Sequence, residues 1–147
     1  MKRARSAERG SAAIEFAIGA MVMGLLFLGT WEFGYAFYVY NNLLAAVDAG
    51  AKYAALKTYD SGSAIPSSAF KTAVQNMVAY GQPSAGTKPV APGLTPGAVV
   101  VTPTFTNGVP TQMTVSLSGY QLNAVVQTFN LSKPSVSYPY LGVYSPP

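Results

Sequence analysis

The chain has 147 residues, of which half are apolar and only 10% are charged. It contains no Cys and no His, which excludes disulfides, thiol chemistry and imidazole groups as ligands or bases. Four of its nine bases precede residue 10, and the later ones are too sparse to follow a phosphate backbone, so we expect no nucleic-acid partner.

The first ten residues, MKRARSAERG, are basic and contain no apolar run, so they are interpreted as a topogenic tail rather than a folded element. Residues 11–31 then carry a single charge. At about 1.5 Å per residue, such a stretch is long enough to cross a hydrocarbon core roughly 30 Å thick. We therefore predict a transmembrane helix. The bases before it, and the absence of any base after it until Lys52, predict a cytoplasmic N-terminus.

Beyond the apolar stretch, the helix is predicted to continue to Tyr59. Aromatic residues cluster between 31 and 40, where their rings suit the outer boundary of a membrane. No Pro occurs before Pro66, and apolar residues recur at helical spacing after residue 42. Asp48 and Lys52 stand four residues apart in the order that favours a solvent-facing ion pair. Residues 60–63, with the sequence DSGS, then end the helix.

A second, short helix is predicted after this stop. Ser67 or Ser68 is its expected N-cap, and Gly81 follows its end. Residues 82–97 contain four Pro and several Gly, a composition that predicts a loop.

The remainder is rich in strand-forming residues. Residues 98–106 and 112–119 flank a reverse-turn dipeptide, Asn107-Gly108, and predict a hairpin in which Pro103 places the first strand at an edge. Residues 120–131 fit either a turn of helix or a strand, and the segment from Val136 is compatible with a last edge strand. The expected fold class is therefore α+β. We expect a leader at 1–10, a long N-terminal helix at 11–59, and a small outer domain at 60–147 with a short helix and a β-hairpin or small antiparallel sheet.

The junction between the basic tail and the apolar helix reads RGSAAIEF. If the chain is cut between Gly10 and Ser11, Glu15 becomes the fifth residue and Phe16 the sixth. This arrangement resembles the type IV prepilin signal, and a basic leader of ten residues fits the same pattern. Gly10 allows a peptidase to approach the backbone closely. An ordinary secretory signal fits less well, because its apolar core usually spans only 7 to 15 residues.

Glu15 needs an explanation within an apolar helix. Insertion of a comparable acid at mid-helix costs on the order of 2.5 to 3.5 kcal/mol. The prepilin resemblance implies that the freed amine of Ser11 on a neighbouring subunit offsets this cost, which assigns Glu15 and Phe16 to subunit assembly. The alternative is an acid of the first helical turn that the helix dipole favours. Ala13, Ala17, Ala20 and Gly24 form a stripe of small residues that either admits a neighbouring helix or reflects ordinary membrane-helix composition.

Among prepilin-like proteins, the chain resembles the TadE-like family over residues 1–57. The resemblance rests on RGSAAIEFA, on the aromatic patch WEFG and on AAVDAGAKYAAL, with a weaker likeness in the ending KPSVSYPYLGVY. It implies a minor pilin or pseudopilin of a Tad (Flp) pilus in the bacterial inner membrane, with its C-terminal domain outside. The implied partners are a prepilin peptidase, other pilin subunits and the platform proteins. Phe16 departs from the Tyr that is common in Flp signals, and the chain is longer than the major Flp pilin.

Three other functions remain as alternatives. An anchored enzyme is disfavoured, because no acid, His or Cys follows residue 60, and only a Ser–Lys arrangement using Lys71 or Lys133 is left. We therefore expect no catalysis, no cofactor and no metal. The second alternative is an uncleaved single-pass envelope protein that acts as an adhesion or assembly module, and the third is a major pilin. The tyrosines near the C-terminus are interpreted as packing residues rather than as a ligand site.

Overall fold

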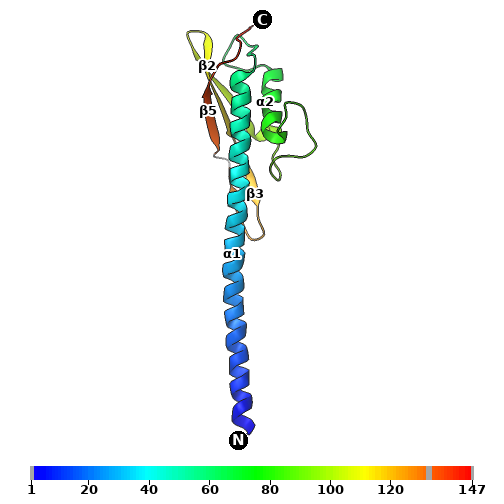
Figure 1. Ribbon diagram of the computed structural model, residues 1–147, viewed down its shortest axis with the longest axis vertical. Coiled ribbons are helices and arrows are strands. Elements are labelled where there is room, and N and C mark those ends of the chain that lie inside the picture. The colour runs from blue at the N-terminus through cyan, green and yellow to red at the C-terminus, as the bar shows by residue number, and fades with distance from the viewer. Residues whose placement is uncertain (1, 132–133, 147) are drawn as a thin grey trace. The chain divides into compact units, whose positions relative to one another are not determined.

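The computed structural model describes the backbone of residues 2–131 and 134–146, and the side chains of the same ranges from Gly10 onward. The backbone divides into two compact units, Met1–Tyr35 and Ala36–Pro147. Two helices and several antiparallel strand pairs make up the described part of the chain, as Figure 1 shows. The predicted α+β class, with a long N-terminal helix, a short helix and small antiparallel sheets, is confirmed.

Helix α1 (Lys2–Leu56) has no interruption. Its backbone is already helical over residues 2–10, where the sequence analysis predicted a tail without folded structure, and this part of the prediction is wrong. The physical reason is local: residues 2–10 contain no Pro, and a single Gly weakens a helix by only about 1 kcal/mol. The other end lies three residues earlier than expected, because the backbone N–H of Tyr59 bonds the carbonyl of Val143, at 2.9 Å, instead of continuing the helix.

In the first unit, α1 is apolar on every side from Gly10 to Tyr35. Nearly all its large side chains are exposed, among them Ile14, Phe16, Ile18, Met21, Leu25, Phe27 and Trp31. A helix that is apolar all round is normally surrounded by a membrane or by other protein. By length and composition, one stretch within Gly10–Leu56 is able to cross a bilayer.

The second unit contains a three-stranded antiparallel sheet in the order β1-β2-β5. Its strands are β1 (Val99–Thr106), β2 (Val109–Leu117) and β5 (Ser135–Pro139). The predicted hairpin is confirmed, since Asn107 and Gly108 form the turn between β1 and β2 with φ values of 53° and 79°. The sheet places β1, with its proline, at an edge, as predicted, and β5 is the expected last strand at the other edge.

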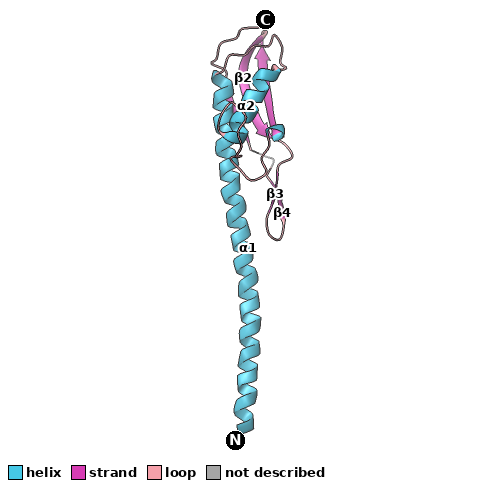
Figure 2. Ribbon diagram, turned by 90° about the vertical axis from the view of Figure 1, so that its right-hand side faces the viewer, coloured by secondary structure: helices cyan, strands magenta, loops and turns pink. Residues whose placement is uncertain are grey.

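A separate two-stranded hairpin consists of β3 (Gln121–Asn123) and β4 (Thr128–Asn130), as Figure 2 shows. Residues 120–131, for which the sequence allowed either a turn of helix or a strand, therefore contain a strand pair. The expected loop is irregular until a short 3-10 turn, η1 (Pro96–Ala98), leads into β1.

Helix α2 (Ser68–Tyr80) has the caps that the sequence predicted. The hydroxyl of Ser67 accepts a hydrogen bond from the N–H of Phe70 at 3.1 Å, and Gly81 ends the helix in the left-handed conformation. Its buried face packs against α1, and a Cβ added at Gly50 would collide with Val78. Gly50 therefore allows the two helices to touch.

The core of this unit lies between α1, α2 and the inner face of the sheet. It begins at Ala36 and includes Val39, Leu43, Val47 and Ala51 on one face of α1. Phe70, Val74 and Val78 from α2 and Val99, Met113 and Val115 from the sheet complete it.

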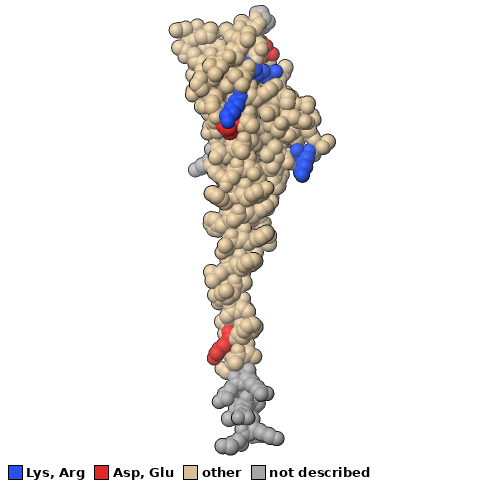
Figure 3. All heavy atoms as spheres, viewed as in Figure 1, with Lys and Arg blue, Asp and Glu red and all other residues tan. Residues whose placement is uncertain are grey.

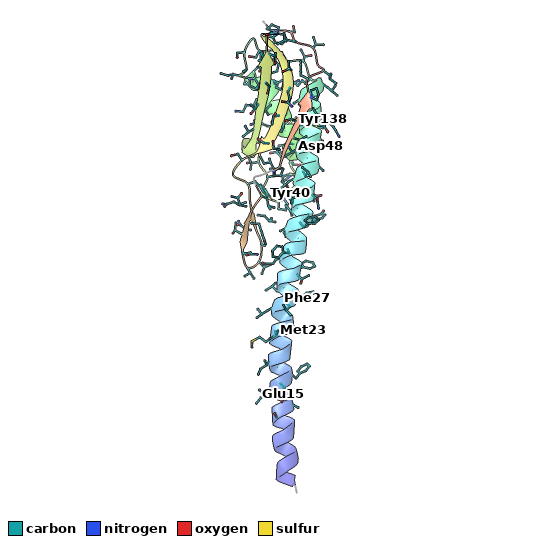
Figure 4. The ribbon with its side chains drawn as sticks, turned by 90° about the vertical axis from the view of Figure 1, so that its left-hand side faces the viewer. Glu15, Met23, Phe27, Tyr40, Asp48 and Tyr138 are labelled. Atoms are coloured by element: carbon teal, nitrogen blue, oxygen red, sulfur yellow. The ribbon has the colours of Figure 1, made fainter. Side chains whose placement is uncertain are left out.

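The predicted pair of Asp48 and Lys52 forms, with 2.7 Å between the Lys52 Nζ and Asp48 Oδ2. The Tyr138 hydroxyl donates to the other carboxylate oxygen of Asp48, also at 2.7 Å, which ties β5 to α1, as Figure 4 shows. The hydrogen bond from Lys52, and then that from Tyr138, lower the pKa of Asp48 from its ordinary value of 3.8. The same hydrogen bond raises the pKa of Lys52.

The other tyrosines near the C-terminus also pack inside this unit. Tyr140 packs against Tyr59, which follows the end of α1. The ring of Tyr59 is fully buried and lies edge-on to Phe70, Phe105 and Tyr140. The Tyr140 hydroxyl lies 2.9 Å from the carbonyl of Lys57 and 2.9 Å from the N–H of Tyr59. These hydrogen bonds attach the C-terminal segment to the end of α1, as expected for packing residues.

Candidate processing and assembly segment

Gly10 and Ser11, the predicted processing site, lie in the first part of α1. Both residues are exposed, and a Cβ added to Gly10 would meet no heavy atom within 4 Å. The bond between them is helical, so a peptidase that needs an extended backbone must first unwind this part of the helix. Opening is easiest near a helix end, where fewer tertiary contacts hold the backbone. The site is open to close approach, but its backbone is helical and not unstructured.

Glu15 projects from α1 one turn beyond Ser11, as Figure 4 shows. The Ser11 hydroxyl donates a hydrogen bond to Glu15 Oε1 at 3.3 Å. A carboxylate can accept about four hydrogen bonds, so this contact leaves Oε2 open to a further donor. Figure 3 shows one acidic side chain on the lower part of the described surface, and the described atoms around it belong to uncharged residues. The helix thus holds an exposed carboxylate on the same side as Ser11, whose backbone nitrogen would become an amine on cleavage.

The residues around Glu15 form an open apolar surface. Phe16 is 78% exposed, and its neighbours Ile14 and Ile18 are also exposed. The small residues Ala13, Ala17 and Ala20 are exposed, and Gly24 has no heavy atom within 4 Å of its added Cβ. The predicted stripe is therefore present, and the described part of the chain leaves it uncovered.

A family model described as TadE-like protein matches residues 10–52. These residues are similar to a TadE-like protein, and we refer to them as the TadE-like segment. The match begins at Gly10, includes Glu15 and Phe16, and covers less than a third of the 147 residues. It confirms the resemblance found in the sequence. Neither the search of curated proteins nor that of solved structures found a match.

The match shows a likeness to TadE-like proteins over residues 10–52. Among the residues that the structure describes, one long apolar helix near the N-terminus indicates a single-pass membrane protein. The roles of Gly10, Ser11, Glu15 and Phe16 in processing and assembly stay predictions.

The TadE-like segment also contains a shallow hollow that sequence reasoning missed. Phe27, Thr30, Trp31, Gly34 and Tyr35 surround a space of about 370 Å³ whose lining is almost entirely apolar. Thr30 satisfies its hydroxyl within the helix by donating to the carbonyl of Leu26 at 2.9 Å. The sequence identified the aromatic cluster but not the hollow. A signal was present, because Thr30 and Gly34 are smaller than the rings beside them.

Glu32 is the other acid of the TadE-like segment that sequence reasoning did not assign to a site. It is only 4% exposed, in contrast to the open position of Glu15. A lone acid directly after an apolar stretch was the available signal. Among the residues that the structure describes, no group of three or more acids, Cys or His has a geometry that could hold a metal ion.

Proposed function

We propose that the chain is a minor pilin or pseudopilin, which joins a Tad (Flp) pilus assembly after a prepilin peptidase removes residues 1–10. One observation carries this proposal: an exposed carboxylate, Glu15, stands one helical turn from Ser11 in a TadE-like apolar helix. An isolated acid in lipid is unfavourable, so its exposure on this surface calls for a cationic partner.

Cleavage would supply that cation. Hydrolysis of the bond between Gly10 and Ser11 adds one water and leaves a carboxylate on Gly10 and an amine on Ser11. The pKa of a chain-terminal amine is about 7.7 to 8.0, so this group is largely protonated at neutral pH. Before cleavage the same nitrogen is an uncharged amide.

The magnitudes favour a pair between subunits. Two unit charges about 4 Å apart attract by about 4 kcal/mol at an effective dielectric constant near 20. This is comparable to the roughly 2.5 to 3.5 kcal/mol that the acid costs at the centre of a membrane helix. The amine of one subunit beside Glu15 of the next therefore stabilises one axial register, and a mismatched register leaves a carboxylate unpaired in an apolar surrounding.

The exposed surface around this pair is suited to the same role. Phe16 and its apolar neighbours face outward, and the small-residue stripe permits close approach of another helix. In this proposal the N-terminus lies in the cytoplasm, the inner membrane holds α1, and residues 60–147 face outward. Other pilin subunits and the inner-membrane platform proteins are the partners, and the chain performs no catalysis.

The test uses the full chain expressed together with its pilus system. Gly10→Ala is expected to abolish processing, and Glu15→Ala to permit processing but reduce incorporation into sheared filaments. Gly29→Ala is the matched control, since it changes an exposed glycine of the same helix that is not part of the small-residue stripe, and it is expected to do neither. Intact mass spectrometry of membrane and filament fractions gives both readouts. Normal trimming of Gly10→Ala would refute the proposed site.

The helical backbone of residues 2–10 favours one second candidate. In that alternative the chain is an uncleaved single-pass envelope protein that acts as an adhesion or assembly module. Glu15 is then not an acid of the first helical turn, because α1 begins at Lys2 and the helix dipole acts only within the first turn. The same mass measurement separates the two functions, because the alternative requires residues 1–10 on every mature chain.

A further inference from the structure

The hairpin of β3 and β4 ends in an apolar tip. Its turn is closed by a hydrogen bond of 2.9 Å from the Ala124 N–H to the carbonyl of Gln127. Between them, Val125 is 78% exposed and Val126 is 68% exposed. Valine is usually buried, so two adjacent exposed valines at a projecting turn form a contiguous apolar contact.

The base of the hairpin is held in the core of the second unit. Leu122 and Tyr120 are both 3% exposed, and Phe129 packs against the same core. The Leu131 N–H donates to the carbonyl of Tyr120 at 3.1 Å and closes the base. The direction of the tip is therefore fixed within this unit.

Within the second unit, the hairpin extends back along α1 toward the N-terminal side of this helix, as Figures 1 and 2 both show. The turn between β1 and β2 lies at the opposite end of the unit, beside the C-terminal end of α1. Ala36 is the residue at which α1 enters this unit directly from the apolar segment that is able to cross a membrane. The valine tip thus extends toward the end of this unit that directly follows the apolar segment in the sequence.

The hairpin also has the composition that a lipid interface accepts. No charged residue occurs between Lys88 and Lys133, so neither strand carries a charge that would have to be desolvated. The hairpin instead contributes uncharged polar groups, from Gln121, Asn123, Thr128 and Asn130 in the strands and from Gln127 in the turn. Amide and hydroxyl groups can bond to lipid headgroups while the apolar turn inserts below them.

We propose that the tip formed by Val125 and Val126 inserts into the outer membrane–water interface beside α1. The partner is a lipid surface, and the inference rests on the membrane crossing by α1 that the proposed function includes. A second contact with the bilayer restricts rotation and tilt of residues 36–147 before assembly, because one helix alone leaves both free. It is independent of leader cleavage and of the role of Glu15.

The absence of Cys from the chain allows a direct test. A Val125→Cys variant of the full chain is labelled with an environment-sensitive fluorophore and reconstituted in phosphatidylethanolamine–phosphatidylglycerol vesicles at low protein density. Nitroxide lipids report contact with the bilayer, and iodide on both sides of the vesicle reports contact with water. Val109→Cys, an exposed valine next to the turn between β1 and β2, is the matched control.

The expected result is a blue-shifted emission for the Val125 label, with strong quenching by shallow nitroxide lipids and weak quenching by iodide. The Val109 label is expected to show the reverse. Equal iodide quenching of both labels, without nitroxide quenching, would overturn the inference. Protection from iodide without nitroxide quenching would also overturn it, because protein and not lipid would then cover the tip. Val126→Cys provides a second label at the same turn.

A third label separates this inference from the membrane crossing itself. Val22→Cys lies in the exposed apolar part of α1 and is expected to be quenched by deep nitroxide lipids. If the Val22 label is quenched and the Val125 label is not, only the hairpin contact is wrong. If neither is quenched, the membrane crossing fails and the hairpin contact fails with it.

Discussion

Two parts of the same helix meet opposite surroundings. From Gly10 to Tyr35, α1 has only two charged side chains, Glu15 and Glu32, and exposes nearly all its large apolar ones. From Ala36 to Leu56, one face is buried and the other carries Asp48 and Lys52. Both parts form helix equally well. The difference shows that helical propensity does not determine burial, and that a periodic polar face marks the part that packs against its own chain. The part without a polar face must find its partners in lipid or in other proteins.

The largest expected effect on stability comes from removing a buried aromatic ring, in contrast to an exposed one. Phe70→Ala removes a fully buried side chain from the core, which typically costs about 3 to 5 kcal/mol. Phe27→Ala removes a ring that is 72% exposed and should leave the fold of the second unit unchanged. Denaturant titration in detergent, followed by near-ultraviolet circular dichroism, measures both. Equal destabilisation by the two variants would contradict the division of α1.

A smaller effect is expected from adding one methyl group to either part of the helix. Gly50→Ala places a Cβ against Val78, whose branched side chain is stiff, and overpacking of this kind costs about 1 to 3 kcal/mol. Alanine restores up to about 1 kcal/mol of helix propensity, so the net result is a moderate destabilisation. Gly24→Ala has the same gain and no collision. In the same titration, the free energy of unfolding of Gly50→Ala should be lower than that of the wild type, and that of Gly24→Ala should not be lower.

The smallest effect concerns the polar face of the packed part. The pKa of Asp48 is lowered in the folded chain, so its contribution to stability is present above the unfolded value and is lost as the pH falls through the folded one. The pKa of Lys52 is raised, so its contribution is present below the unfolded value and is lost at higher alkaline pH. Asp48→Asn should flatten both limbs of a plot of melting temperature against pH. An unchanged acid limb would show that this cluster contributes nothing to stability.

Much of this fold is predictable from local chemistry. The turn at Asn107-Gly108, the cap at Ser67 and the pair of Asp48 and Lys52 each depend on residues close in sequence. The sequence did not predict the hairpin of β3 and β4, because its strands are only three residues long and gain their burial from distant elements. The early end of α1 was missed for a related reason, since Tyr59 bonds a segment more than 80 residues away.

The candidate segment shows the same limit. Gly10, Ser11, Glu15 and Phe16 were identified from their spacing alone, and the TadE-like match covers all four. What spacing does not reveal is the geometry: the helical backbone at Gly10, the hydrogen bond from Ser11 to Glu15, and the burial of Glu32. These depend on how far the helix extends and on what covers it, and neither property is encoded in a motif of eight residues.

The most direct test of the central claim is the N-terminus of the mature protein. Chains extracted from membranes of cells that carry the pilus system are analysed by intact mass and by N-terminal sequencing. The account predicts that the chain begins at Ser11, with the mass of residues 1–10 missing, so that a new amine is present one turn from Glu15. Mature chains that begin at Met1 would contradict it.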